Sequence, residues 1–251
     1  MNSLIFFIGL IITLTFVPAL TNAQEHTGTL EIVIDDDFPP YTVQNSDETT
    51  SGLFVEILRS ALHHSHIEFN IIGRPWKRVI AMTDRSEIDA SLPWRSKKER
   101  FEKYNMVGPI TKYGSRTIFW ARKDFNLDDW FHLKDLSEYR IGTISGYAYP
   151  REFEEATYLK KLEMTTTNGP LIKMLSLGRV DIIIGDEHVL ATEALAQNLS
   201  GKFKQVGPAL ETVKRYVAVP KTKKDIAALI GKALQTFQDT PQYQDIIQRY
   251  Q

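Results

Sequence analysis

Four short segments of the sequence carry the side chains best suited to binding chemistry. They are residues 35–41 (DDDFPPY), residues 93–95 (PWR), residues 145–149 (SGYAY) and Asp186. Together they supply carboxylates, a guanidinium, aromatic rings and a glycine-containing turn whose backbone N–H groups can donate hydrogen bonds. A small zwitterion, which carries one anionic and one cationic group, needs this combination of partners.

Each of these segments follows an apolar run that is typical of a buried β-strand. The predicted strands are residues 30–34, 68–72, 88–92, 139–144 and 180–184. Apolar residues at helical spacing predict helices over residues 53–62, 76–82 and 171–177. Ligands of open α/β sheets bind beyond the carboxyl ends of the strands, so we expect the four segments to lie at binding edges.

The strand–helix–strand order occurs twice along the chain. The stretches RSEIDASLPW and LGRVDIIIGD both place an aspartate just inside a strand that follows a helix and a turn. This repetition predicts two α/β lobes with parallel or mixed sheets. The apolar runs 117–121 and 216–220 are candidate crossings between the lobes. We therefore expect a first lobe over residues 24–112, a second lobe over 113–209, and a return to the first lobe over 210–251, ending in two helices.

The N-terminus carries an export signal in its sequence. Residues 4–17 form an apolar run too short to span a bilayer comfortably, and Thr21-Asn22-Ala23 offers small residues at a cleavage site. We expect a signal peptide over residues 1–23, cut before Gln24, and export to the periplasm. Because the leader has no lysine or arginine, an uncleaved N-terminal anchor remains the alternative. The chain has no cysteine, which excludes lipid attachment through an N-terminal Cys and thiolate chemistry.

Composition and charge exclude several other classes of protein. The chain is 43% hydrophobic and 24% charged with a formal net charge of −1, so it has no general basic field to recruit nucleic acid. The acidic run 35–37 lacks the spacers and glycine of an oxygen-only cation loop, and the histidines are scattered. We expect a monomer with no cofactor and no metal, whose recognition of a small molecule is local.

Longer stretches of the chain resemble a known family. They read DDDFPPY, GLFVEILRSAL, KKERFEKYNMVGPI, LKDLSEYRIGTISGY, LGRVDIIIGDEHVL and YVAVPK. Over residues 28–251 the chain is similar to bacterial extracellular solute-binding protein family 3, the receptors of polar amino-acid ABC transporters. The resemblance implies a type II periplasmic-binding fold with two lobes and a hinged cleft. It also implies a role without catalysis, in which an inner-membrane ABC permease or a sensor reads the ligand-bound form.

The resemblance also implies roles for individual residues. Arg100, in KKERF, matches the arginine that grips the ligand α-carboxylate, and Asp186, in IIIGD, matches the aspartate that holds the α-ammonium. The turn that assists the carboxylate maps to Ser145, Gly146 and Tyr147. The aromatic residues that cover the ligand side chain map to Phe38 and Tyr41.

The sequence departs from the family pattern just before Arg100. The family usually has small residues and a hydroxyl there, whereas this chain has Pro93-Trp94-Arg95 and then Lys97. A second guanidinium at Arg95 would favour a ligand with extra negative charge if it faced the cleft. Trp94 follows a strand end and is the preferred tryptophan for the cleft, and Asp35 is the preferred carboxylate of the acidic run. The motif RPWKR at residues 74–78 resembles one branch of the family, whose ligands the resemblance does not fix.

Two other functions remain open at this point. One is an enzyme on the same scaffold, similar to a dehydratase, for which Glu187 and His188 beside Asp186 are the only neighbours that invite the idea. The other is an ectodomain that senses a ligand or binds a partner protein and has no transport role.

Overall fold

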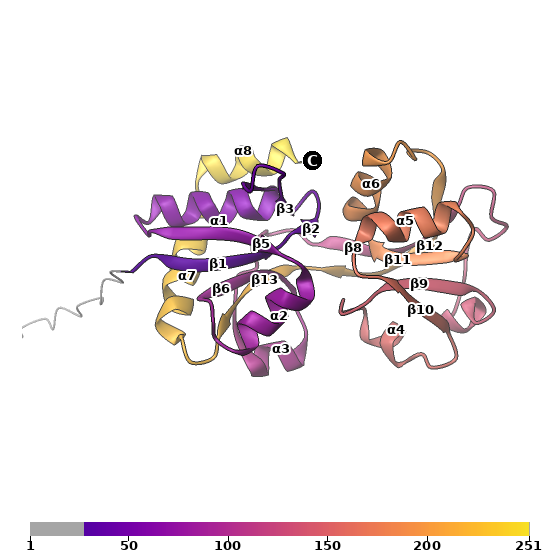
Figure 1. Ribbon diagram of the computed structural model, residues 1–251, viewed down its shortest axis with the longest axis horizontal. Helices are drawn as coiled ribbons and strands as arrows, with labels where there is room; N and C mark the ends of the chain where they lie inside the picture. Colours follow the sequence, from indigo (N-terminus) through magenta and orange to yellow (C-terminus); the bar gives the residue numbers. More distant parts are fainter. Residues whose placement is uncertain (1–27, 251) are drawn as a thin grey trace, which may run out of the picture.

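The computed structural model describes residues 28–250, and the expected signal peptide lies outside these residues. The described chain forms two α/β lobes side by side, each built on a five-stranded mixed sheet with helices against it (Figure 1). No helix in this part of the chain is long and apolar enough to cross a bilayer. The two-lobed α/β prediction is confirmed.

The first lobe contains the sheet β5-β1-β6-β13-β7. Its strands are β1 (Leu30–Asp35), β5 (Phe69–Arg74), β6 (Ala90–Arg95), β7 (Tyr104–Val107) and β13 (Arg215–Pro220). Strand β1 runs parallel to β5 and β6, whereas β13 runs antiparallel to β6 and β7. A small sheet before the first helix joins β2 (Asp37–Phe38), β3 (Thr42–Gln44) and β4 (Thr50–Ser51).

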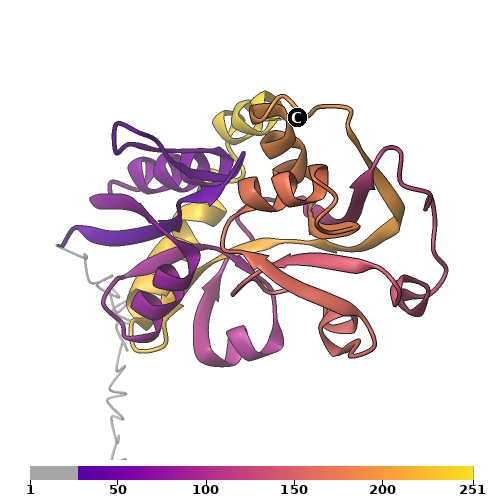
Figure 2. The same cartoon turned by 45° about the vertical axis from the view of Figure 1, so that its right-hand side comes forward.

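The helices of the first lobe come from both ends of the chain. They are α1 (Leu53–His64), α2 (Trp76–Asp84), α3 (Lys98–Lys103), α7 (Lys224–Phe237) and α8 (Pro241–Arg249). Figures 1 and 2 show the C-terminal helices, drawn in yellow, against the indigo and purple elements of this lobe.

The second lobe contains the sheet β10-β9-β11-β8-β12. Its strands are β8 (Ser115–Arg122), β9 (Arg140–Ile144), β10 (Lys160–Thr165), β11 (Ile182–Asp186) and β12 (Phe203–Val213). Its helices are the short 3-10 turn Leu133–Leu136, α4 (Arg151–Glu155), α5 (Asn168–Ser176) and α6 (Glu187–Ala196). Strand β9 pairs in parallel with β10 and β11, and β8 pairs antiparallel with β11 and β12.

The crossings between the lobes lie just before the two runs that the sequence offers for them. The chain leaves the first sheet after Val107 and enters the second at Ser115, and it returns between Val213 and Arg215. The runs 117–121 and 216–220 lie inside β8 and β13, each of which has a paired neighbour on both sides. They are apolar because they are buried strands within a sheet, which is the alternative origin of such a run.

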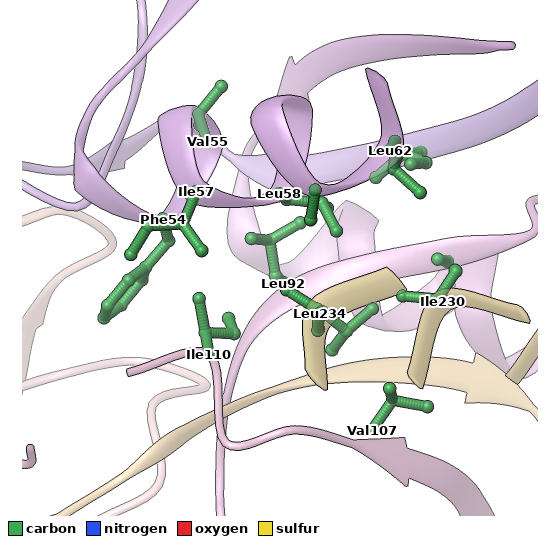
Figure 3. Packing of buried hydrophobic residues seen from close by; sticks show 14 of the residues in the cluster. Phe54, Val55, Ile57, Leu58, Leu62, Leu92, Val107, Ile110, Ile230 and Leu234 are labelled. Carbon is green, nitrogen blue, oxygen red and sulfur yellow. The ribbon is translucent and has the colours of Figure 1, made fainter. Parts of the chain in front are cut away.

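The core of the first lobe lies between α1, the sheet and α7. Figure 3 shows Leu58 and Leu62 of α1 facing Leu92 of the sheet and Ile230 and Leu234 of α7. All five side chains are at most 2% exposed. This packing holds β1 and β6 in register, and therefore fixes the positions of the side chains at their carboxyl ends.

The substitution Leu58→Ala tests this packing. Leu58 is fully buried, so the change removes apolar contacts and leaves a cavity, and we expect the free energy of unfolding to fall by about 2–5 kcal/mol. Leu195→Ala is the matched control because Leu195 is 67% exposed, and its effect should stay within about 0.5 kcal/mol. Urea unfolding followed by circular dichroism measures both; equal effects of the two changes would contradict the assignment of the core.

Candidate functional site

A cavity lies between the two lobes and is lined by residues of both. Strands β1 and β6 of the first lobe end at this cavity with Asp35 and Arg95, and β9 and β11 of the second lobe end there with Ile144 and Asp186. The carboxyl ends of the central parallel strands of both lobes therefore meet at one place, as the sequence predicts. Six of the predicted site residues line the cavity: Asp35, Phe38, Arg95, Arg100, Tyr147 and Asp186.

Asp35 is a buried carboxylate at the end of β1. It is 4% exposed, and its Oδ2 accepts a hydrogen bond of 3.1 Å from the hydroxyl of Tyr147 in the second lobe. Its Oδ1 accepts a long bond of 3.4 Å from the backbone N–H of Asp37. Burial raises the pKa of Asp35 to about 7, and the charges of Asp36 and Asp37 add to the effect.

Asp186 is a second buried carboxylate, and it accepts hydrogen bonds from four donors. Its Oδ1 accepts from the Tyr41 hydroxyl at 3.3 Å and from the backbone N–H of His188 at 3.2 Å, which caps α6. Its Oδ2 accepts from the Ser115 hydroxyl and from Nη2 of Arg215 at 3.3 Å. One carboxylate thus joins residues of both lobes.

Arg95 faces the cavity. It is 4% exposed, its Nη2 donates to the Thr117 hydroxyl at 2.8 Å, and its Nη1 contacts the carboxylate of Glu211. Burial lowers the pKa of Arg95 to about 9, with the charge of Arg215 as the next cause. The buried Nε of Arg95 has no hydrogen-bond partner in the described residues.

Arg100 projects from α3 into the cavity wall. Its guanidinium stacks on the ring of Trp94 at 4.8 Å, and its Nη1 donates to the backbone carbonyl of Arg95 at 3.1 Å. Burial lowers the pKa of Arg100 to about 10, and the nearby charge of Arg215 contributes. Within residues 28–250, Arg100 takes part in no ion pair.

Trp94 does not line the cavity, contrary to the preference given to it above. It is 1% exposed, its ring packs between Trp76 and Tyr104 with centroid distances of 4.8 Å to each, and its Nε1 donates to Ser91. Successive side chains of a strand point to opposite faces, so Pro93 and Arg95 reach the cavity while Trp94 enters the core. Trp76, at the start of α2, is the tryptophan in the cavity wall.

Three further predicted residues lie near the cavity without lining it. Tyr41 stacks on Phe54 at 4.5 Å and reaches the site only through its hydrogen bond to Asp186. The backbone N–H of Ser145 is bonded to the Thr165 carbonyl at 2.9 Å. Gly146 has a φ of +84°, and a Cβ added there would lie 3.1 Å from Cγ of Lys77 in the first lobe, so a close approach of the lobes depends on this glycine.

The described lobes touch each other around the cavity. Besides the bond from Tyr147 to Asp35, the backbone N–H of Asn168 donates to Asp37 at 3.2 Å, and Lys97 forms an ion pair with Glu154 at 2.5 Å. These contacts join side chains of the first lobe to the second lobe. The structure is therefore the closed arrangement of the two lobes.

Sequence reasoning missed several residues of the cavity wall. Arg215, Thr117 and Asn168 line it as well. Arg215 is the first residue of β13, next to the returning crossing, and its guanidinium lies 4.9 Å from the ring centroid of Phe38. The sequence feature that could have pointed to Arg215 is its place as a polar residue at the start of an apolar run. Glu187 and His188 are absent from the cavity wall, and Glu187 pairs with Arg116 at 2.6 Å.

Comparisons with known proteins agree with this architecture. The family model of bacterial extracellular solute-binding proteins, family 3, matches residues 30–251. The L-cystine-binding protein TcyJ of Escherichia coli (strain K12) is 22% identical over 220 residues, which cover 87% of this chain and 81% of that protein.

Solved structures show the same fold at low sequence identity. The P235GK mutant of ArgBP from T. maritima has a TM-score of 0.77 and 17% identity, covering 89% of this chain and 95% of that one. A histidine kinase sensor domain with similarity to periplasmic binding proteins has a TM-score of 0.77 and 16% identity, covering 88% and 95%. The GluR0 ligand-binding core from Nostoc punctiforme, in complex with L-glutamate, has a TM-score of 0.74 and 19% identity, covering 88% and 98%. The fold is that of the periplasmic binding proteins.

The raised pKa of Asp35 predicts a pH-dependent stability that Asp35→Asn removes. In the folded protein this carboxyl keeps its proton up to about pH 7, whereas its ordinary pKa is 3.8. The wild-type protein should therefore lose stability as the pH rises from about 4 through about 7, and the variant should lose less, by a difference on the order of a few kcal/mol.

Urea unfolding at several pH values between 4 and 8 measures this difference. Asp245→Asn, at an exposed position of α8, is the control and should follow the wild type. If the free energy of unfolding changed with pH in the same way for the wild type and for Asp35→Asn, the pKa of Asp35 would be the same in the folded and unfolded protein, and the prediction would be wrong.

Proposed function

The chain belongs to the bacterial extracellular solute-binding proteins, family 3, and from this premise we propose that it is the periplasmic receptor of an ABC-type permease. It captures a small amino-acid-like or carboxylate-bearing molecule between its two lobes. The first 23 residues direct its export, and the mature chain acts as a monomer.

The observation that supports this proposal most directly is that Arg100 has no ionic partner among the described residues. Its guanidinium lines a cavity enclosed by both lobes, and no carboxylate of the described chain pairs with it. Arg100 is half-buried in the cavity wall, and a ligand carboxylate would supply its missing counter-charge with two parallel hydrogen bonds. Arg100 therefore receives the carboxylate of the ligand.

Closure of the two lobes is the change by which the permease recognises that the receptor has bound its ligand. The contacts of Tyr147 with Asp35, of Asn168 with Asp37 and of Lys97 with Glu154 form only when the lobes are together. A ligand that binds better to the closed form shifts the population toward it, with the two crossings as hinges. The permease then distinguishes the closed form from the open one.

The class of ligand follows from what similar proteins bind. Similar proteins bind L-cystine, arginine, glutamine and L-glutamate, all of which share an α-carboxylate and an α-ammonium. This supports an amino acid or a close analogue as the ligand.

A membrane sensor is the second candidate partner. The histidine kinase sensor domain that shares this fold supports it, because a closed lobe pair can be read by a receptor kinase as well as by a permease. The two partners use the same ligand site.

A binding screen with Arg100 variants tests the proposal. The purified chain from Gln24 onward is screened by thermal shift against the twenty standard L-amino acids, L-cystine, dicarboxylates and polyamines. A compound at a hundred times its Kd should stabilise the fold by about 2.7 kcal/mol. Arg100→Ala should weaken binding of a carboxylate compound by at least about tenfold, and Arg100→Lys should restore only part of it.

Arg151→Ala is the control because the Arg151 side chain is 86% exposed, outside the cavity. It should bind as the wild type does. A compound that binds Arg100→Ala with wild-type affinity would contradict the proposed site, and a wild type that binds no carboxylate compound would contradict the proposed function.

A further inference from the structure

The charged side chains in the cavity wall divide into paired and unpaired groups. Arg95 contacts Glu211, and Arg215 forms an ion pair with Asp186. Arg100 has no ionic partner in residues 28–250, and neither has Asp35. The cavity therefore presents one cation and one carboxylate whose charges the described part of the protein leaves uncompensated.

Asp186 has no room for another donor. A carboxylate offers about four acceptor sites, and those of Asp186 receive Tyr41, His188, Ser115 and Arg215. Its side chain is only 3% exposed. The guanidinium of Arg215 thus occupies the place beside Asp186 that a ligand ammonium would need, and a ligand could take that place only by displacing a buried cation.

Asp35 is in the opposite situation. It is 4% exposed, it accepts one good hydrogen bond from Tyr147 and a long one from Asp37, and the charges near it are the like charges of Asp36 and Asp37. An ionised carboxylate in such surroundings is costly, and a cation from the ligand would relieve that cost.

We propose that Asp35, and not Asp186, receives the α-ammonium of an amino-acid ligand whose carboxylate lies on Arg100. Both charged ends of the ligand are then held by the first lobe, on β1 and α3. The second lobe closes over them, and the hydroxyl of Tyr147 donates to the other side of the Asp35 carboxylate. Arg215 determines this arrangement because it neutralises Asp186. This inference rests on the proposed function.

Paired variants distinguish the two carboxylates. Asp35→Asn keeps the shape of the side chain and removes its charge, so its affinity for the L-amino acids that bind the wild type should fall by about 10- to 100-fold. Each of these amino acids is compared with the 2-hydroxy acid of the same side chain, which has no ammonium. Asp35→Asn should remove the preference for the amino acid over the hydroxy acid.

The matched variant is the double substitution Asp186→Asn with Arg215→Gln, which removes the ion pair without leaving one partner charged. It should keep the preference for the amino acid, although its affinity can change for both compounds alike. Circular dichroism and thermal unfolding show that each variant is folded. If the double variant loses the preference and Asp35→Asn keeps it, the inference is wrong while the proposed function stands. If the wild type binds a dicarboxylate but no L-amino acid, the inference is wrong while the proposed function stands; if it binds no carboxylate compound at all, both fail.

Proton release is an independent readout that a structural role of Asp35 would not produce. With a pKa of about 7, Asp35 is partly protonated at pH 7, and an ammonium beside it drives the proton off. Calorimetric titrations in phosphate and in Tris between pH 5 and pH 8 should therefore show proton release when an L-amino acid binds. Asp35→Asn should abolish the release. Equal apparent enthalpies for the wild type in the two buffers would overturn the inference.

Discussion

The carboxylate of Asp186 is the contact on which the closed arrangement depends. It accepts hydrogen bonds from Tyr41 in the first lobe, from Ser115 at the end of one crossing, from Arg215 at the end of the other, and from the first turn of α6. Removal of one partner from a buried pair leaves an uncompensated charge, at a cost of about 3–5 kcal/mol. Because the two crossings meet at this carboxylate, Asp186 acts together with the contacts of Tyr147, Asn168 and Lys97 in setting the relative position of the lobes.

The rest of the cavity follows from how the remaining charges are compensated. Arg95 is neutralised by Glu211 and held by Thr117, so its position is fixed without a ligand. Arg100 rests on the ring of Trp94, which gives the guanidinium a rigid aromatic support but no counter-charge. Asp35 lies at the end of β1 with a raised pKa. A site of this kind is prepared for a zwitterion, since each end of the ligand meets one uncompensated group.

Much of this site is predictable from the sequence, because strand ends can be located from apolar runs. Asp35, Arg95, Tyr147 and Asp186 follow or end such runs, and all four line the cavity. The prediction that Trp94 faces the cavity was wrong, and Trp76 lines the cavity instead. The face on which a strand residue lies depends on the register of the strand, and a short apolar run does not determine that register. The pairing of Arg215 with Asp186 joins residues 29 positions apart on different sheets. Strands β10 and β12 escaped prediction because their mixed sequences, KKLEMT and FKQVGPALETV, follow no clear alternation at the sheet edges.

The crystal structure of the chain with a bound L-amino acid tests the account most directly. We expect the ligand to lie in the cavity between the lobes, with its carboxylate on the guanidinium of Arg100 and its ammonium within hydrogen-bond distance of Asp35, while Arg215 stays on Asp186. A ligand whose ammonium displaces Arg215 and binds Asp186, or a ligand held away from Arg100, would contradict it.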